Sequence, residues 1–163
     1  MRGFCEPHLP AGVLLDMVPE SVRTDYFKFA FIRNPWDLVV STYHYLKKVF
    51  AEHAHLGLVD PDYDHILKTG GFGDFVRAYP MINADMTSFI SDSDGHLLVD
   101  FVGRCERIEE DFEVICRRIG VTATLRHENV TEHAHYREYY NGATRAIVEE
   151  HFRRDIERFG YKF

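Results

Sequence analysis

The sequence has no long apolar run and few cysteines. No segment approaches the roughly 18 consecutive apolar residues of a membrane-spanning helix, and residues 1–20 contain acids and prolines where a signal peptide has its apolar stretch. The three cysteines, Cys5, Cys105 and Cys116, lack metal-ligand spacing and predict reduced thiols. These absences predict a cytoplasmic protein with no membrane partner.

Basic residues are also too few for a nucleic-acid partner. The 19 lysines and arginines stand against 26 aspartates and glutamates, which gives a formal charge of −7. Such a balance argues against nucleic acid or an anionic membrane as the main partner. The 163 residues are 45% apolar and 14% aromatic, enough for the core of a single domain spanning residues 1–163.

The stretch on which the rest of the interpretation depends is 26–41. Three phenylalanines alternate with smaller or polar residues before an apolar run, a pattern that predicts a strand ending at Arg33. Asn34 is suited to cap a helix and Pro35 to open it. The helix is expected to bury one stripe and to turn Ser41 away from the core; the stripe consists of Trp36, Val39, Val40, Tyr43, Lys47 and Phe50.

Arg33 and Ser41 are the candidate binding residues of this stretch. Ligands collect at the carboxyl ends of strands in open α/β sheets, and the fork of an arginine grips two phosphate oxygens beside a helix N-terminus that favours anions. Ser41 is expected about 9 Å further along the helix axis. Two interpretations stay open: both side chains converge on one anion, or Arg33 pairs with Asp37 and Ser41 is ordinary surface.

Further elements are expected downstream. Residues 52–68 are polar and predict an irregular surface segment, and residues 97–102 predict a second strand, after which Arg104 and Glu106 either face a ligand or form an ion pair with each other or with Asp111. Helices are predicted near 11–17, over 108–120 and over 143–159. The inward stripe expected for the second of these is Ile108, Phe112, Ile115 and Ile119.

Arg33-Asn34-Pro35 followed by Ser41 resembles the 3′-phosphate-binding segment of sulfotransferases that use 3′-phosphoadenosine 5′-phosphosulfate (PAPS). Similarity to the carbohydrate-type and related bacterial members continues in order through residues 99–112 and 136–140 to the aromatic tail at 159–163. The resemblance implies an α/β three-layer domain with a mostly parallel, P-loop-like sheet. It also implies transfer of a sulfuryl group from PAPS to a hydroxyl acceptor, a saccharide in this branch, with Arg33 and Ser41 holding the 3′-phosphate. By the same resemblance, Tyr136 and Arg137 are candidates to touch adenine or phosphate; the alternative is that these tyrosines attach a loop to the core.

The N-terminus departs from this family. Its members begin with a strand and a loop whose backbone amides cradle the 5′-phosphosulfate, and no such loop precedes Arg33, so we expect an N-terminally truncated member. His8 resembles the histidine proposed as general base in several carbohydrate sulfotransferases, and an imidazole titrates near the working pH. The alternative is an exposed histidine in a proline-rich lead-in. By the resemblance, residues 83–90 correspond to a helix that lines the acceptor cleft in family members, often with a glutamine near its start; here Asn83 and its neighbours occupy that place.

No metal is predicted as a cofactor. The histidine pairs His53 and His55, and His133 and His135, stand two residues apart, a spacing that does not share a helix face. In-line sulfuryl transfer requires neither a metal nor a covalent enzyme intermediate. Two other functions stay open: a non-catalytic remnant of the family that cannot activate sulfate, and an oligomeric interaction domain in which an exposed sheet edge pairs with a second copy.

Overall fold

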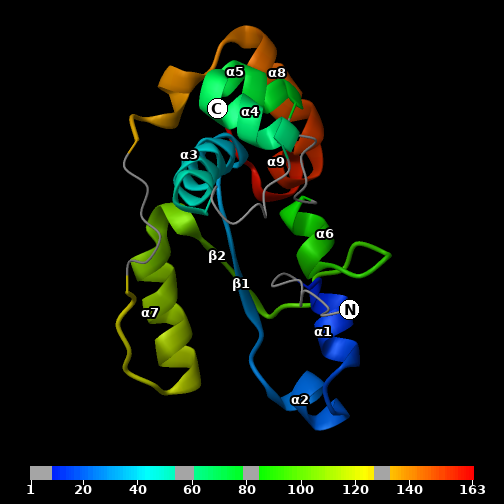
Figure 1. Ribbon diagram of the computed structural model, residues 1–163. Coiled ribbons are helices and arrows are strands. Elements are labelled where there is room, and N and C mark those ends of the chain that lie inside the picture. Colours follow the sequence, from blue (N-terminus) through cyan, green and yellow to red (C-terminus); the bar gives the residue numbers. More distant parts are fainter. Residues whose placement is uncertain (1–8, 54–60, 79–84, 127–132) are drawn as a thin grey trace. The chain divides into compact units, whose positions relative to one another are not determined.

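Strands β1 (Phe29–Ile32) and β2 (Phe101–Arg104) pair in parallel in the computed structural model of this protein (Figure 1). Their register sets Phe31 opposite Gly103. A Cβ atom at position 103 would lie 2.5 Å from Cε1 of the Phe31 ring, a separation too short for two carbon atoms. Glycine at this position therefore lets the aromatic ring lie against the neighbouring strand.

The structure describes residues 9–53, 61–78, 85–126 and 133–163. Packing divides the chain into two units, each built from two separate stretches of sequence. The first unit comprises Met1–Ile32 with Ala84–Leu125, and the second comprises Arg33–Asn83 with Arg126–Phe163. The single domain suggested by chain length stays a prediction.

The first unit contains the strand pair, several short helices and one longer helix. They are α1 (Ala11–Asp16), α2 (Glu20–Asp25), α6 (Met86–Ile90), the 3₁₀ turn η2 (Cys105–Arg107) and α7 (Ile108–Ile119). The helices expected near 11–17 and over 108–120 are confirmed. Three acids occupy the first turn of α7, two arginines its last, and Gly120 ends it with φ 73°.

The second strand begins later than the sequence pattern predicts. Residues 97 and 98 pair with the end of α6 instead: Leu97 bridges Ser91 in antiparallel fashion, and the Leu98 N–H donates to the Ile90 carbonyl. The Asp100 carboxylate accepts the Lys28 N–H at 2.8 Å, and the ladder with β1 starts only at Phe101. The hydrophobic run at residues 97–102 correctly indicated an extended segment. Which part of it pairs with β1 depends on where the hydrogen-bonding partners lie.

The inward face of α7 also differs from the expected stripe. Ile115 is buried as predicted, but Ile119 is 46% exposed and Asp111 is buried. The Asp111 carboxylate accepts the Arg104 N–H at 2.7 Å and the Arg107 Nε–H at 3.1 Å. Asp111 is thus in an ion pair with Arg107. A buried carboxylate needs such partners, and together they join the end of β2 to α7.

The second unit is helical. It contains α3 (Pro35–His53), α4 (Pro61–Thr69), α5 (Phe72–Ala78), the 3₁₀ turn η3 (Tyr136–Tyr139), α8 (Gly142–His151) and α9 (Arg153–Phe159). Helix α3 packs against α4, α5, η3 and α8. The predicted stripe of α3 is buried at Trp36, Val39, Val40 and Tyr43. Their neighbours in the core of this unit include Leu67, Phe75, Val76, Val148 and Phe152.

Two expectations for this unit were wrong. The segment 52–68 is not wholly irregular, because α3 continues to residue 53 and α4 begins at Pro61. Proline is tolerated at the first position of a helix, because an N–H there would have no acceptor within the helix. The last helix is two helices, since the backbone leaves helical geometry at Phe152 (φ −98°, ψ 24°), whose side chain is 2% exposed. Helical periodicity is consistent with a buried Phe152, but it does not predict the break in the helix there.

Together the elements make a mixed α/β protein with a small parallel sheet and mostly helices. The described residues contain two paired strands, so the three-layer, P-loop-like sheet stays a prediction. Among these same residues, no helix has both the length and the apolar character needed to cross a membrane.

Candidate functional site

The N-terminus of α3 is built as the sequence predicts. Pro35 is the first helical residue, and the Asn34 side-chain oxygen accepts the backbone N–H groups of Trp36 at 3.0 Å and Asp37 at 3.4 Å. Asn34 is itself buried, and its side-chain amide donates to the Lys162 carbonyl. The cap fixes the first turn of α3, which directly follows Arg33 in the chain.

Arg33 pairs with Asp37, one of the two alternatives that the sequence left open. Its Nε lies 2.6 Å from Oδ2 of Asp37, and the two side chains are 30% and 22% exposed. Within the described parts of the chain, neither Nη nitrogen of Arg33 has a hydrogen-bonding or ionic partner. The ion pair therefore occupies one edge of the guanidinium and leaves its terminal N–H groups available.

Ser41 lies one helical turn beyond Asp37 on α3. Residues four apart share a helix face, so the Ser41 hydroxyl is on the face that carries the Arg33–Asp37 pair. Ser41 is half-buried, and its hydroxyl makes no hydrogen bond to any residue that the structure describes. By contrast, the neighbouring Thr42 hydroxyl donates to the Leu38 carbonyl at 2.8 Å. The face of α3 that carries Asp37 and its partner Arg33 therefore also carries Ser41, and both Arg33 and Ser41 have hydrogen-bond donors available for a ligand.

Aromatic side chains pack beside the start of α3. The Tyr140 hydroxyl donates to the Trp36 carbonyl at 2.8 Å, and burial, followed by the negative charges of Asp37 and Tyr136, raises the pKa of Tyr140 far above its usual range. The Phe163 ring meets Trp36 edge-on at 5.5 Å and Tyr140 at 5.6 Å. Tyr140 therefore attaches its segment to the core of this unit.

Tyr136 and Arg137, the other candidates in this segment, both contact Phe163. The Tyr136 ring lies edge-on to Phe163 at 5.7 Å, and the Arg137 guanidinium is 5.8 Å from each of the two ring centroids. The Arg145 guanidinium lies over the same ring at 4.4 Å. Phe163 thus has two cations beside it, each held by a cation–π contact.

A second cluster on α3 was missed by the sequence analysis. His44 Nε2 lies 2.9 Å from the Tyr139 hydroxyl, and the His44 ring stacks on His133 with centroids 5.2 Å apart and planes 20° apart. Burial, the charge of His133 and the charge of Lys47 lower the pKa of His44. The one available signal was spacing, since position 44 follows 37 and 41 at helical intervals; its partners lie some 90 residues away.

This cluster predicts a pH dependence of stability. Because the pKa of His44 is lowered on folding, the unfolded chain takes up the proton first, and stability falls as the pH drops through the usual value near 6.5. We expect the free energy of unfolding, measured by urea titration at about pH 7.5 and about pH 5, to fall more in the wild type than in His44→Gln.

The matched control for this prediction is His65→Gln, which removes an exposed histidine from α4. It should keep the wild-type pH dependence. An equal loss of stability on acidification in the wild type and in His44→Gln would contradict the prediction.

The remaining candidates lie elsewhere. His8, His55, Asn83 and the side chain of His53 lie outside the described part of the chain. Gly70 and Gly71 precede the short helix α5.

One group with metal-ligand chemistry occurs on an exposed turn. Ligand atoms of Asp92, Asp94 and His96 lie within 4.8 Å of one another. The Asp92 carboxylate accepts the backbone N–H groups of both other residues, and the bond from His96 is the main cause of its lowered pKa. These bonds are those of a turn closed by a carboxylate.

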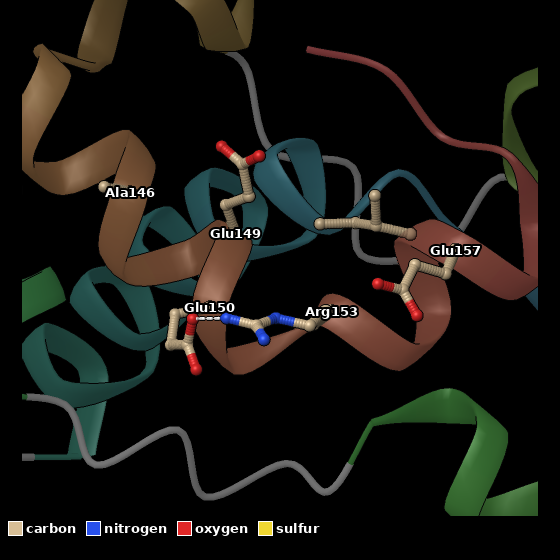
Figure 2. A pocket seen from close by; sticks show the side chains of 6 residues that line it. Ala146, Glu149, Glu150, Arg153 and Glu157 are labelled. Carbon is tan, nitrogen blue, oxygen red and sulfur yellow. Dashed lines mark hydrogen bonds and ion pairs between the residues drawn. The ribbon is translucent and has the colours of Figure 1, made fainter.

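A hollow of about 480 Å³ lies along α8 and α9, and none of the candidate residues named above lines it (Figure 2). Three glutamates and one arginine supply its charged lining, and Arg153 forms an ion pair with Glu150. The full lining is Ala146, Glu149, Glu150, Arg153, Ile156 and Glu157. This net negative charge disfavours a phosphate-bearing ligand.

Comparison with known proteins identifies a family. The model of the sulfotransferase family matches residues 14–162, nearly the whole chain. An uncharacterized protein of Archaeoglobus fulgidus is 27% identical over 117 residues, which cover 72% of this chain and 87% of that protein. No solved structure matches.

Proposed function

This chain belongs to the sulfotransferase family, and from that premise we propose that it transfers a sulfuryl group from PAPS to a hydroxyl acceptor. The family supports sulfuryl transfer as the reaction class. The identity of the donor, the acceptor and the residues that bind them are our proposals. The cytoplasmic location, the saccharide nature of the acceptor and the three-layer sheet belong to the same proposal.

The observation that carries the proposal is the state of Arg33. Its Nε is bound by Asp37, while its Nη groups have no partner among the described residues. An arginine in this state offers two parallel donors, an arrangement that matches two oxygens of a phosphate. We propose that Arg33 binds the 3′-phosphate of the donor.

Two further features favour a phosphate at this place. Helix α3 is 19 residues long, and the partial positive charge of its N-terminus favours an anion beside Arg33. Ser41 has a hydroxyl with no partner in the described structure and lies on the face of the Arg33–Asp37 pair. We propose Ser41 as the second ligand of the 3′-phosphate.

The proton of the acceptor hydroxyl needs a base. We propose His8 for this role from family resemblance; it lies outside the described residues. A base within hydrogen-bonding reach raises the nucleophilicity of the hydroxyl, and donors aimed at the departing bridging oxygen stabilise its developing charge. Binding of the nucleotide without transfer to any acceptor would favour the alternative of a non-catalytic remnant.

Isothermal titration calorimetry with two nucleotides tests the proposal. We expect 3′-phosphoadenosine 5′-phosphate to bind with a micromolar dissociation constant, on the order of −8 kcal/mol. Adenosine 5′-phosphate, which lacks the 3′-phosphate, should bind at least about tenfold more weakly. Equal binding of the two nucleotides, or no binding of either, would contradict the proposed site.

A further inference from the structure

Asp37 is the residue that decides which edge of the Arg33 guanidinium is free. Its Oδ2 takes Nε at 2.6 Å, and both side chains are more than two-thirds covered. A carboxylate bound across the two Nη nitrogens would occupy one of the edges at which a guanidinium presents two parallel donors to a phosphate. The observed contact at Nε leaves that edge open.

We propose that Asp37 is a positioning residue for nucleotide recognition: by holding Nε of Arg33, it directs both Nη groups to the 3′-phosphate of the ligand. This inference rests on the proposed function. Asp37 does not itself touch the phosphate in this arrangement. It acts through Arg33, and its contribution is selective for nucleotides that carry a 3′-phosphate.

The backbone of Asp37 gives it the rigidity that a positioning residue needs. It lies in the first turn of α3, where its N–H is within 3.4 Å of the Asn34 cap and its charge is favoured by the helix N-terminus. The adjacent Trp36 is 2% exposed and anchors this turn in the core. An arginine side chain alone samples many rotamers, and pairing to a fixed carboxylate removes most of them before the ligand arrives.

A competing role for Asp37 makes the opposite prediction. A carboxylate near a bound phosphate repels it, so if charge dominated, removing the carboxylate would tighten binding. Two facts favour positioning. The Asp37 charge is already paired with Arg33, and its contact lies on the Nε edge, away from the free donors.

The experiment measures an affinity ratio. For each variant, calorimetry gives the dissociation constants of 3′-phosphoadenosine 5′-phosphate and of adenosine 5′-phosphate. The affinity ratio is the constant of adenosine 5′-phosphate divided by that of 3′-phosphoadenosine 5′-phosphate, and it isolates the recognition of the 3′-phosphate. We expect Asp37→Ala to reduce this ratio about tenfold, Asp37→Asn to reduce it less because an amide oxygen still accepts from Nε, and Asp37→Glu to restore part of it. A merely structural role would weaken both nucleotides equally and leave the ratio unchanged.

Asp74→Asn is the matched control. Asp74 also lies in the first turn of a helix, α5, and pairs with an arginine, Arg77, at 3.0 Å. This variant should keep the wild-type ratio, and melting temperatures should show that every variant is folded.

The outcomes separate two failures. If the wild type discriminates between the nucleotides, Arg33→Ala abolishes discrimination and the Asp37 variants keep or raise the ratio, the positioning role is overturned and the proposed function stands. If the wild type itself does not discriminate, the proposed function fails and this inference fails with it.

Discussion

Replacing Arg33 by alanine should weaken binding of 3′-phosphoadenosine 5′-phosphate by roughly 10- to 150-fold, about 1.5–3 kcal/mol. The reason is the pair of charge-assisted donors that Asp37 leaves free on this guanidinium. Calorimetric titration of the nucleotide into wild type and variant measures the effect.

Ser41→Ala removes one neutral donor and should cost about 0.5–1.5 kcal/mol of nucleotide binding free energy.

Two controls make the Arg33 result specific. Arg33→Lys keeps the charge but loses the fork, so it should recover only part of the affinity. Arg153→Ala removes an exposed arginine that pairs with Glu150 beside the acidic hollow, and it should bind the nucleotide as the wild type does. Wild-type affinity in folded Arg33→Ala would refute the assignment of this residue to the phosphate.

Replacing Trp36 by alanine should lower the free energy of unfolding by about 3–5 kcal/mol. Trp36 is 2% exposed, its ring meets Phe163 at 5.5 Å, and its indole N–H lies 3.4 Å from the Arg145 carbonyl. Its loss opens a cavity where α3, the C-terminal tail and α8 meet. A loss of this size is a large fraction of the roughly 5–15 kcal/mol that stabilises a domain.

Urea denaturation monitored by circular dichroism is the suitable measurement. Tryptophan fluorescence cannot be used, because Trp36 is the single tryptophan of the chain and the variant lacks it. Tyr45→Ala is the control on the same helix: Tyr45 is 42% exposed, and its removal should change stability by less than about 0.5 kcal/mol. Comparable losses in the two variants would show that Trp36 is not a core anchor.

The start of α3 could be predicted because its causes are local. Asn34 caps through N–H groups two and three residues ahead, and Pro35 fits the first helical position for reasons within its own ring. The same holds for α7, whose terminal charges and closing Gly120 are set within one turn of the helix. Short-range hydrogen bonds of this kind can be predicted from the sequence alone.

The candidate site was predicted only in part. Arg33 was predicted from its place at a strand end and Ser41 from its place on the following helix, and family resemblance suggested both; the sequence left the partner of Arg33 open. The structure places Asp37 at its Nε. Between a carboxylate four residues away and an unknown anion, periodicity alone gives no preference, because both choices are compatible with the same helix.

By itself, the sequence determined the turn from strand to helix at Arg33, the helical stripe from Trp36 to Tyr43 and membership of a family whose pattern spans the chain. Only the tertiary structure decided the starting point of β2, the bend at Phe152 and the pairing of His44 with Tyr139 and His133. The division has one physical cause. The turn and the stripe depend on residue spacing and on contacts within a few residues, while the ladder of β2 and the His44 cluster depend on partners 72 and 95 residues away in the chain, which meet only when each unit packs.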